Sequence, residues 1–280
     1  MGMMITATAY SQLITDSILV EDHYRTFNYK MPAGSIKGGS LMFVMHGSGS
    51  SSSEMIKHTT KLEALTAKDK FIVVYPDGYQ HYWNECRKYS NAAANKENIN
   101  EEAFFAAMIG YFKKKFAIDP EKVFAAGFSG GGQMSYKLAM VMPDKIKAVT
   151  AIVANIPDSA SCDCVLSNKA KPIMIINGTD DQTNPYNGGE MFVNNASFGV
   201  VRSTEGSFHY WASLAGYKGE PVKTILPDTD PNDKKTIEQY SYRETNKPPV
   251  ILLKVIGGHH DYPNDIDVYV YAWEFFKSLK

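Results

Sequence analysis

The stretch Gly127-Phe128-Ser129-Gly130-Gly131 decides the expected fold, because it is a G-x-S-x-G motif in a specific local context. A strand-like run over 122–126 precedes it, and a helix-like run over 133–142 follows it. A residue between such a strand and helix lies in a strained turn, and the surrounding glycines supply the backbone freedom that this turn needs. The motif therefore predicts a nucleophile elbow that presents Ser129 at the edge of a sheet.

Short apolar runs alternate with helical patterns on both sides of this elbow. Continuous apolar runs of this kind are typical of strands buried in a parallel sheet. The other expected strands are 41–45, 71–75, 148–153, 172–177 and 249–256, and the other expected helices are 54–68, 101–116, 204–215 and 273–279. The alternation predicts the α/β class, with a mainly parallel central sheet covered by helices on both faces.

The chain is expected to fold as one domain over 18–280, which begins with an antiparallel hairpin over 18–31. Its 280 residues lie within the range of single α/β domains. The formal net charge is −1, and the longest basic run, Lys113-Lys114-Lys115, ends an apolar helix pattern. No apolar stretch approaches the roughly 20 residues that span a membrane. These features argue against nucleic acid or a membrane as a partner.

Residues 1–17 are expected to be an N-terminal extension. Residues 1–9 are apolar and end in Ala7-Thr8-Ala9, which matches the end of a secretory signal that lacks its basic region. A truncated signal peptide and an ordinary terminus are both open interpretations. We expect a secreted or periplasmic protein, with a cytoplasmic one as the alternative.

The three cysteines are Cys86, Cys162 and Cys164. Cys162 and Cys164 are too close for a relaxed mutual bridge, so Cys86 is expected to pair with one of them in an oxidising compartment. Three reduced cysteines are the alternative. Cys-Asp-Cys without a second ligand pair is a weak zinc signal.

An elbow serine needs a base, a group that orients the base, and donors for an oxyanion. The strand over 172–177 is followed by Asp180-Asp181, and the last strand is followed by His259-His260. The order serine, aspartate, histidine is the one that α/β-hydrolases use. Adjacent histidines point apart and no helical histidine spacing is present, so no metal is expected.

The expected oxyanion donors are the backbone N–H groups of Ser48 and Gly130. Ser48 lies in the loop His46-Gly47-Ser48-Gly49, which follows the strand over 41–45. A second loop, 79–84, is rich in aromatic residues and includes Tyr82 and Trp83. These two aromatic residues either form the wall of an apolar substrate pocket or belong to the core.

Taken together, these segments resemble the esterase family of polyhydroxybutyrate depolymerases and feruloyl or acetylxylan esterases. The resemblance runs from about residue 18 to the end. It rests on 46–49, Tyr75-Pro76-Asp77-Gly78 with Trp83-Asn84, 127–131, Asn177-Gly178-Thr179-Asp180-Asp181 with Pro185-Tyr186, and Gly257-Gly258-His259-His260 with Pro263. The resemblance implies an α/β-hydrolase fold, no cofactor, and ester hydrolysis through an acyl-enzyme.

The resemblance also selects the residues of a catalytic triad with Ser129. The family's acid follows Gly-Thr by one residue, which falls on Asp181, and its histidine precedes Trp-Pro by one residue, which falls on His260 with tyrosine replacing tryptophan. His259 stands where a third glycine is usual, and Asn177 where histidine is usual. Both departures concern the substrate side, where His259 is an expected contact.

Feruloyl or acetyl esters of polysaccharide are the expected substrates, because no polymer-binding module or Ser/Thr/Pro-rich linker is seen in the sequence. Hydrolysis of polyhydroxyalkanoate oligomers is the alternative within the same chemistry. A non-catalytic binding protein, a peptidase and an acyltransferase on the same fold also stay open. The sequence does not reveal the oligomeric state, and a monomer is the working expectation.

Overall fold

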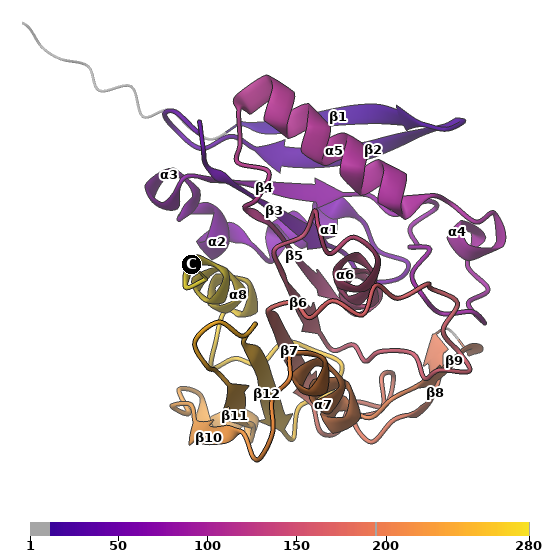
Figure 1. Ribbon diagram of the computed structural model, residues 1–280, viewed down its shortest axis with the longest axis vertical. Helices are drawn as coiled ribbons and strands as arrows, with labels where there is room; N and C mark the ends of the chain where they lie inside the picture. Colours follow the sequence, from indigo (N-terminus) through magenta and orange to yellow (C-terminus); the bar gives the residue numbers. More distant parts are fainter. Residues whose placement is uncertain (1–11, 194, 280) are drawn as a thin grey trace, which may run out of the picture.

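The computed structural model describes residues 12–193 and 195–279, and a ten-stranded sheet runs through its centre (Figure 1). In sheet order the strands are β1 (Leu13–Val20), β2 (His23–Lys30), β4 (Phe71–Pro76), β3 (Ser40–Met45), β5 (Val123–Phe128), β6 (Ala148–Ile152), β7 (Ile173–Gly178), β12 (Val250–Ile256), β11 (Thr236–Tyr242) and β10 (Val222–Ile225). The central strands from β4 to β12 are parallel, and the flanking strands pair antiparallel. The expected α/β architecture is confirmed.

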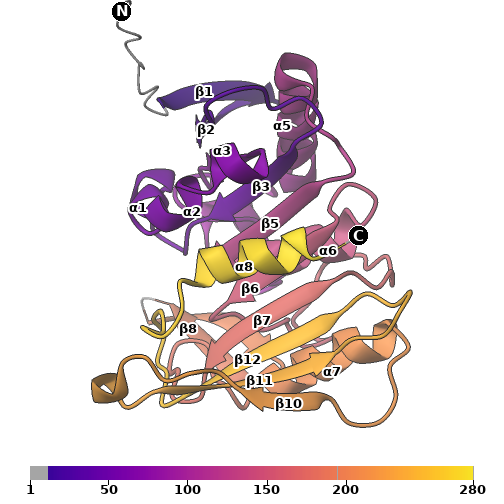
Figure 2. The ribbon, with the colours of Figure 1, turned by 90° about the vertical axis from the view of Figure 1, so that its left-hand side faces the viewer.

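Helices cover both faces of this sheet, as Figure 2 shows with α8 lying across one of them. α5 (Glu101–Phe116), α6 (Gly130–Val141) and α7 (Thr204–Leu214) pack on one face, and α1 (Ser52–Lys57), α2 (Thr60–Glu63) and α8 (Val268–Lys277) pack on the other. Successive side chains of a strand point to opposite faces. Leu41 and Phe43 therefore join the first core, and Met42 and Val44 join the second.

The N-terminal boundary differs from the expected one. The hairpin begins at Leu13 rather than Ile18, and Leu13 pairs with Lys30, so residues 13–17 belong to the sheet and not to an extension. Exposed and half-buried residues alternate there, as in a strand with one solvated face. The possible signal remnant over residues 1–9 lies outside the described residues.

Other segments also differ from the sequence-based expectation. The single helix expected over 54–68 is divided into α1, α2 and α3 (Thr66–Asp69). His58 is the C-cap of α1, and Lys70, with a φ of +55°, is the C-cap of α3. The last helix begins at Val268, because the Asp267 side chain caps its first turn. The hairpin of β8 (Gly189–Val193) and β9 (Ala196–Val201) and the strands β10 and β11 were not expected.

Two short helices complete the described structure: α4 (Ala93–Lys96) and the 3₁₀ helix η1 (Pro231–Asp233). None of the helices in the described ranges is long and apolar enough to cross a membrane.

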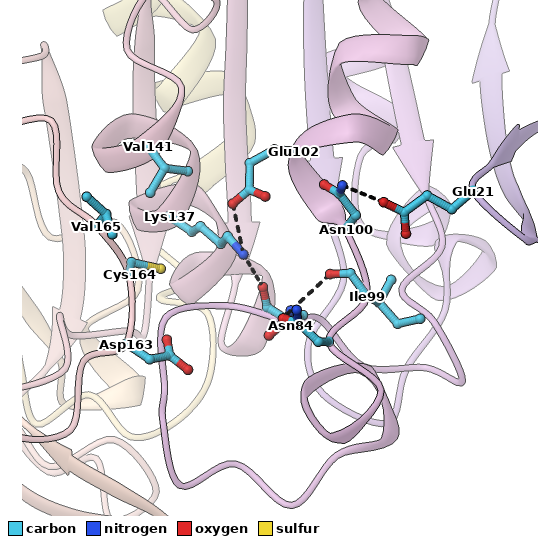
Figure 3. A pocket seen from close by; sticks show the side chains of 11 residues that line it. Glu21, Asn84, Ile99, Asn100, Glu102, Lys137, Val141, Asp163, Cys164 and Val165 are labelled. Carbon is cyan, nitrogen blue, oxygen red and sulfur yellow. Dashed lines mark hydrogen bonds and ion pairs between the residues drawn. The ribbon is translucent and has the colours of Figure 1, made fainter.

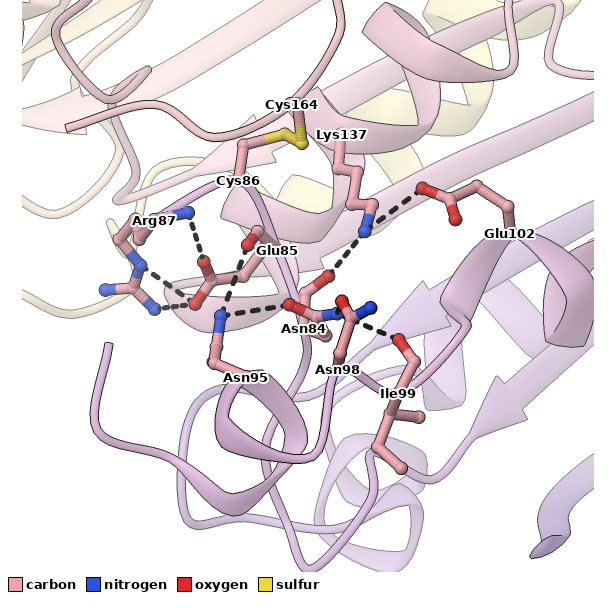
Figure 4. The surroundings of a disulfide bond; sticks show 10 residues. All are labelled: Asn84, Glu85, Cys86, Arg87, Asn95, Asn98, Ile99, Glu102, Lys137 and Cys164. Atoms are coloured by element: carbon pink, nitrogen blue, oxygen red, sulfur yellow. Dashed lines mark hydrogen bonds and ion pairs between the residues drawn. A yellow bond between two sulfur atoms is a disulfide. The ribbon is translucent and has the colours of Figure 1, made fainter. Parts of the chain in front are cut away.

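A disulfide joins Cys86 to Cys164 and leaves Cys162 as a half-buried thiol (Figure 4). It connects the loop after β4 to the loop after β6. Beside it, the Arg87 guanidinium pairs with Glu85 and lies 4.7 Å from the centre of the Phe198 ring. Arg87 also donates to Met191 Sδ, so this buried pair ties the β8–β9 hairpin to the loop that carries the disulfide.

We expect removal of the disulfide to lower stability strongly. Replacing both Cys86 and Cys164 by serine removes a cross-link between residues that are 78 positions apart in the chain. The free energy of unfolding should therefore fall by about 2–5 kcal/mol. Urea denaturation without reductant measures this change. Cys162→Ser is the control and should cost less than about 1 kcal/mol. Equal losses in the two variants would contradict a structural role for the bridge.

Candidate active site

The topology of the sheet brings four loops to one edge. β3 and β5 are parallel neighbours with Met45 opposite Gly127, so the loop after β3 lies beside Ser129. β7 and β12 are also parallel neighbours, with Gly178 opposite Val255. The segments that contain Asp181 and His260 leave these two strands at the same edge, which is where open α/β sheets place their sites.

Ser129 lies in a strained turn between β5 and α6. Its φ is +53° and its ψ is −115°, a region that non-glycine residues rarely occupy. A Cβ atom at position 127 would lie 2.1 Å from the Gly131 carbonyl oxygen, and one at position 131 would lie 2.3 Å from the Met45 carbonyl oxygen. Glycine is therefore required at both positions for the chain to turn this tightly.

Continuous hydrogen bonds link Ser129, His260 and Asp181. His260 Nε2 lies 2.9 Å from Ser129 Oγ, and His260 Nδ1 lies 2.7 Å from Asp181 Oδ2. The buried Asp181 also accepts backbone hydrogen bonds from Thr183 and Asn184, each 2.8 Å long. These bonds orient the carboxylate toward the imidazole, which in turn faces the serine hydroxyl.

The neighbouring carboxylate does not take part in this arrangement. Asp180 is exposed and accepts a hydrogen bond from the Thr179 hydroxyl at 2.8 Å. The structure therefore brings together the three residues that the family pattern selects, and it leaves Asp180 outside them.

Two backbone N–H groups lie next to the serine. A Cβ atom at position 130 would lie 3.0 Å from the Ser48 nitrogen, so the turn after β3 contacts the start of α6. Gly130 is the first residue of α6, where an N–H group has no acceptor within the helix. Ser48 donates to no backbone acceptor in the described part of the chain. Both donors are available for an oxygen that carries negative charge.

A buried histidine holds the end of β3 in place. His46 Nε2 accepts a hydrogen bond from the Gly78 N–H at 2.9 Å, so the ring proton is on Nδ1 and is donated to the Gly47 carbonyl at 2.7 Å. The indole N–H of Trp83 donates to the His46 carbonyl at 2.9 Å. Burial lowers the pKa of His46, which keeps the ring neutral. These bonds set the direction of the loop that carries Ser48.

This arrangement predicts a pH-dependent loss of stability. The folded pKa of His46 lies below its ordinary value of 6.5, so its contribution to the free energy of unfolding is complete above about pH 6.5 and is lost as pH falls toward the folded pKa. Stability should therefore fall more steeply below about pH 6.5 in the wild type than in His46→Gln. Urea denaturation at a series of pH values tests this, and parallel curves would contradict it.

A cavity of about 530 Å³ opens over Ser129. Phe128, Tyr262 and His58 form one side, with ring centres 4.7 Å apart for the first two residues and 5.2 Å apart for the last two. Phe192 and Val193 of β8 also line the cavity. The other lining residues are Gly47, Ser48, Ser50, Glu54, Met55, Ser129, Thr183, His260 and Asp261. The lining of the cavity over Ser129 thus combines aromatic and apolar side chains with polar and charged ones.

Comparison with known proteins identifies the family. The model of the phospholipase/carboxylesterase family matches residues 33–209, more than half of the chain. The chain belongs to the phospholipase/carboxylesterase family.

Relatives and solved structures agree with this assignment. The chain is 25% identical to a probable feruloyl esterase C of Aspergillus niger over 85% of this chain and 77% of that protein. It is 28% identical to feruloyl esterase B of Piromyces equi over 55% of this chain and 28% of that protein. An acetyl xylan esterase from Aspergillus awamori has the same fold, with a TM-score of 0.64, 15% identity, and 94% and 99% coverage of the two chains.

The chain spans less than half the length of the first curated relatives that it matches. The resemblance to feruloyl and acetylxylan esterases is confirmed by these matches. The resemblance to polyhydroxybutyrate depolymerases is not tested by them and stays a prediction.

The three residues that were expected to contact the substrate do not line the cavity over Ser129. Trp83 is 1% exposed and packs in the core, so it supports the site from below and cannot form its wall. The Tyr82 hydroxyl lies close to Gly49 in the loop after β3. His259 is exposed, and its Nδ1 lies 3.2 Å from the Asp180 carbonyl oxygen. Position after a strand did not reveal which way these side chains face.

The lining residues that sequence reasoning missed come from α1 and from the β8–β9 hairpin. Met55, His58 and Phe192 lie outside every catalytic motif of the chain. The run over 189–201 is rich in β-branched and aromatic residues and follows two glycines, which was a usable hairpin signal. The position of that hairpin next to Ser129 is set by tertiary packing and not by a local sequence pattern.

Asn177, which stands in place of the family's histidine, has a structural role. Its side chain accepts from the Ala154 N–H at 2.9 Å and donates to Asn155 Oδ1 and Thr204 Oγ1, both at 2.9 Å. It is 1% exposed. Asn177 therefore connects β7 to the segment after β6 and to the first residue of α7.

A second and larger cavity, of about 700 Å³, lies elsewhere and contains none of the three linked residues (Figure 3). The buried Lys137 ammonium there donates to the Asn84 carbonyl at 2.8 Å and pairs with Glu102 at 3.1 Å. Its hydrogen bonds are thus satisfied within the protein. Within residues 12–193 and 195–279, no group of three or more His, Cys, Asp or Glu side chains is arranged to hold a metal.

Proposed function

We propose that this protein is a serine carboxylic-ester hydrolase that acts through an acyl-enzyme. The observation that carries the proposal is the continuous bond path from Ser129 Oγ through His260 to Asp181, with lengths of 2.9 and 2.7 Å, at a serine whose φ is +53°. Strained backbone of this kind is typical of functional sites, and here it accompanies a hydroxyl within hydrogen-bond distance of the proposed base. Membership of the phospholipase/carboxylesterase family supports the same chemistry.

The proposed reaction has two halves. Ser129 Oγ attacks the ester carbonyl carbon while His260 Nε2 takes the serine proton, and that proton then passes to the departing alcohol. Asp181 holds the proton on His260 Nδ1 and stabilises the imidazolium. The N–H groups of Ser48 and Gly130 bind the oxyanion. Water then attacks the acyl-enzyme by the same route, releases the acid and restores Ser129.

Feruloyl or acetyl esters of polysaccharide are the proposed substrates. The aromatic side chains Phe128, Tyr262 and Phe192 around Ser129 suit a planar aromatic acyl group. Several relatives are named as feruloyl or acetylxylan esterases. The disulfide further supports a secreted or periplasmic location, because such bonds persist in oxidising compartments. Release of polyhydroxyalkanoate units is the second candidate, on the family resemblance alone.

The direct test compares p-nitrophenyl acetate, p-nitrophenyl butyrate and methyl ferulate, together with labelling by a fluorophosphonate. We expect ester hydrolysis, with the free acid as product, and a single labelled peptide that contains Ser129. Transfer of the acyl group to added xylose in preference to water would identify an acyltransferase. No hydrolysis together with no labelling would overturn the proposal and favour a non-catalytic binding protein.

A further inference from the structure

A second hollow lies next to the cavity over Ser129. It measures about 230 Å³ and is lined by His58, Lys61, Tyr262, Pro263, Asn264, Ile266, Asp267, Val268 and Tyr269. His58 and Tyr262 line both spaces. The two hollows are therefore adjacent on the surface, and this pair of rings separates them.

The second hollow is small for an independent site, since ligand pockets usually measure about 300–1,000 Å³. Together with the adjacent cavity of about 530 Å³, the second hollow forms one longer groove. The dividing pair is accessible, because His58 is exposed and Tyr262 is partly exposed. A ligand longer than the first cavity would cross these rings and reach the second hollow.

The polar groups of this hollow suit a ligand that carries hydroxyl groups. Lys61 is exposed on α2 and has no ion-pair partner among the described side chains. The Asn264 amide nitrogen donates to Asp230 at 3.0 Å, which leaves its carbonyl oxygen free to accept. One Asp267 oxygen is occupied by the N–H groups that begin α8. The hollow thus offers a charged donor and a neutral acceptor beside aromatic rings.

Sugar rings combine these requirements. Their C–H faces pack against aromatic side chains, and their hydroxyl groups both donate and accept hydrogen bonds. A long acyl chain would instead leave the Lys61 ammonium and the Asn264 oxygen facing hydrocarbon, which is unfavourable. The chemistry of the hollow therefore favours the carbohydrate part of an ester over an acyl tail.

We propose that His58, Tyr262, Lys61 and Asn264 form a subsite for a sugar unit of the oligosaccharide that carries the ester. This inference rests on the proposed esterase function and adds a binding determinant to it. Lys61 and Asn264 line only the second hollow, so they act on binding of the sugar and not on the acyl group. His58 and Tyr262 border both spaces. The contribution of the subsite appears only when the leaving alcohol is long enough to cross the ring pair.

The test uses two esters with the same acyl group, methyl ferulate and a feruloylated arabinose-bearing xylo-oligosaccharide. We expect Lys61→Ala to raise KM for the oligosaccharide ester about tenfold, the effect of losing one hydrogen bond from a charged donor. Its kinetics on methyl ferulate should stay within about twofold of wild type. Lys57→Ala is the matched control, because Lys57 lies on α1, pairs with Glu54 and lines neither space.

The outcomes separate the subsite from the enzyme. Unchanged KM for both esters in Lys61→Ala, with methyl ferulate still hydrolysed, would overturn the subsite and leave the esterase proposal standing. An equal KM increase in Lys57→Ala would also overturn it, because a general surface-charge effect would then explain the result. Absence of hydrolysis of both esters by the wild type would overturn the proposed function and the subsite with it.

Discussion

Replacing Ser129 by alanine should lower turnover of p-nitrophenyl acetate by a factor of about 10⁴–10⁶. The substitution removes the oxygen that would form the acyl-enzyme and leaves the His260–Asp181 bond intact. Residual activity should come only from the oxyanion donors and substrate binding. Steady-state kinetics of freshly purified variant and wild type provide the measurement.

The fold should survive this change. The Ser129 N–H donates to the Ile152 carbonyl and the Ser129 carbonyl accepts from the Gln133 N–H, both at 2.9 Å, and alanine retains both bonds. Circular dichroism and the urea midpoint should therefore match those of the wild type. A variant that is folded and loses less than tenfold in turnover would remove Ser129 from the mechanism.

Replacing Asp181 by asparagine should lower turnover by about 10⁴, because an amide in this position favours the wrong imidazole tautomer. Asp181 Oδ2 lies 2.7 Å from His260 Nδ1, and its other oxygen accepts two backbone N–H groups. An amide NH₂ at the first position would face the ring nitrogen as a donor.

Asp180→Asn is the matched control for this prediction. The two residues are adjacent and the charge change is the same, but Asp180 is exposed, and among the described side chains only the Thr179 hydroxyl donates to its carboxylate. Its substitution should change turnover by less than about threefold. A larger loss in Asp180→Asn than in Asp181→Asn would show that the carboxylates exchange roles in solution.

Local sequence patterns were sufficient to predict a helix or strand where its own residues supply the cap or the apolar face. The helix over 101–116 begins and ends at the predicted residues, because Asn100 caps its first turn and an apolar face follows. Buried strands such as β4 and β7 were recognisable from their continuous apolar runs. The division of 54–68 into three helices was not, because short helices depend on packing against the sheet more than on propensity.

The partner of Cys86 in the disulfide also could not be predicted from local sequence patterns. The sequence left Cys162 and Cys164 as equal partners for Cys86. In the folded chain the backbone of Arg87 pairs with that of Cys162, and the Asp163 N–H donates to the Cys86 carbonyl at 3.2 Å. This pairing leaves Cys164 to meet Cys86. The choice depends on how two distant loops align.

The sequence by itself determined the buried parallel strands, the glycine-rich turn at Ser129, and the positions of Asp181 and His260 after strand ends. These features follow from short-range periodicity and turn chemistry, which a few neighbouring residues specify. Only the tertiary structure decided that Trp83 faces the core, and that Phe192 and His58 line the cavity over Ser129. Such contacts join residues far apart in the chain, and the packing of whole elements against one another selects them.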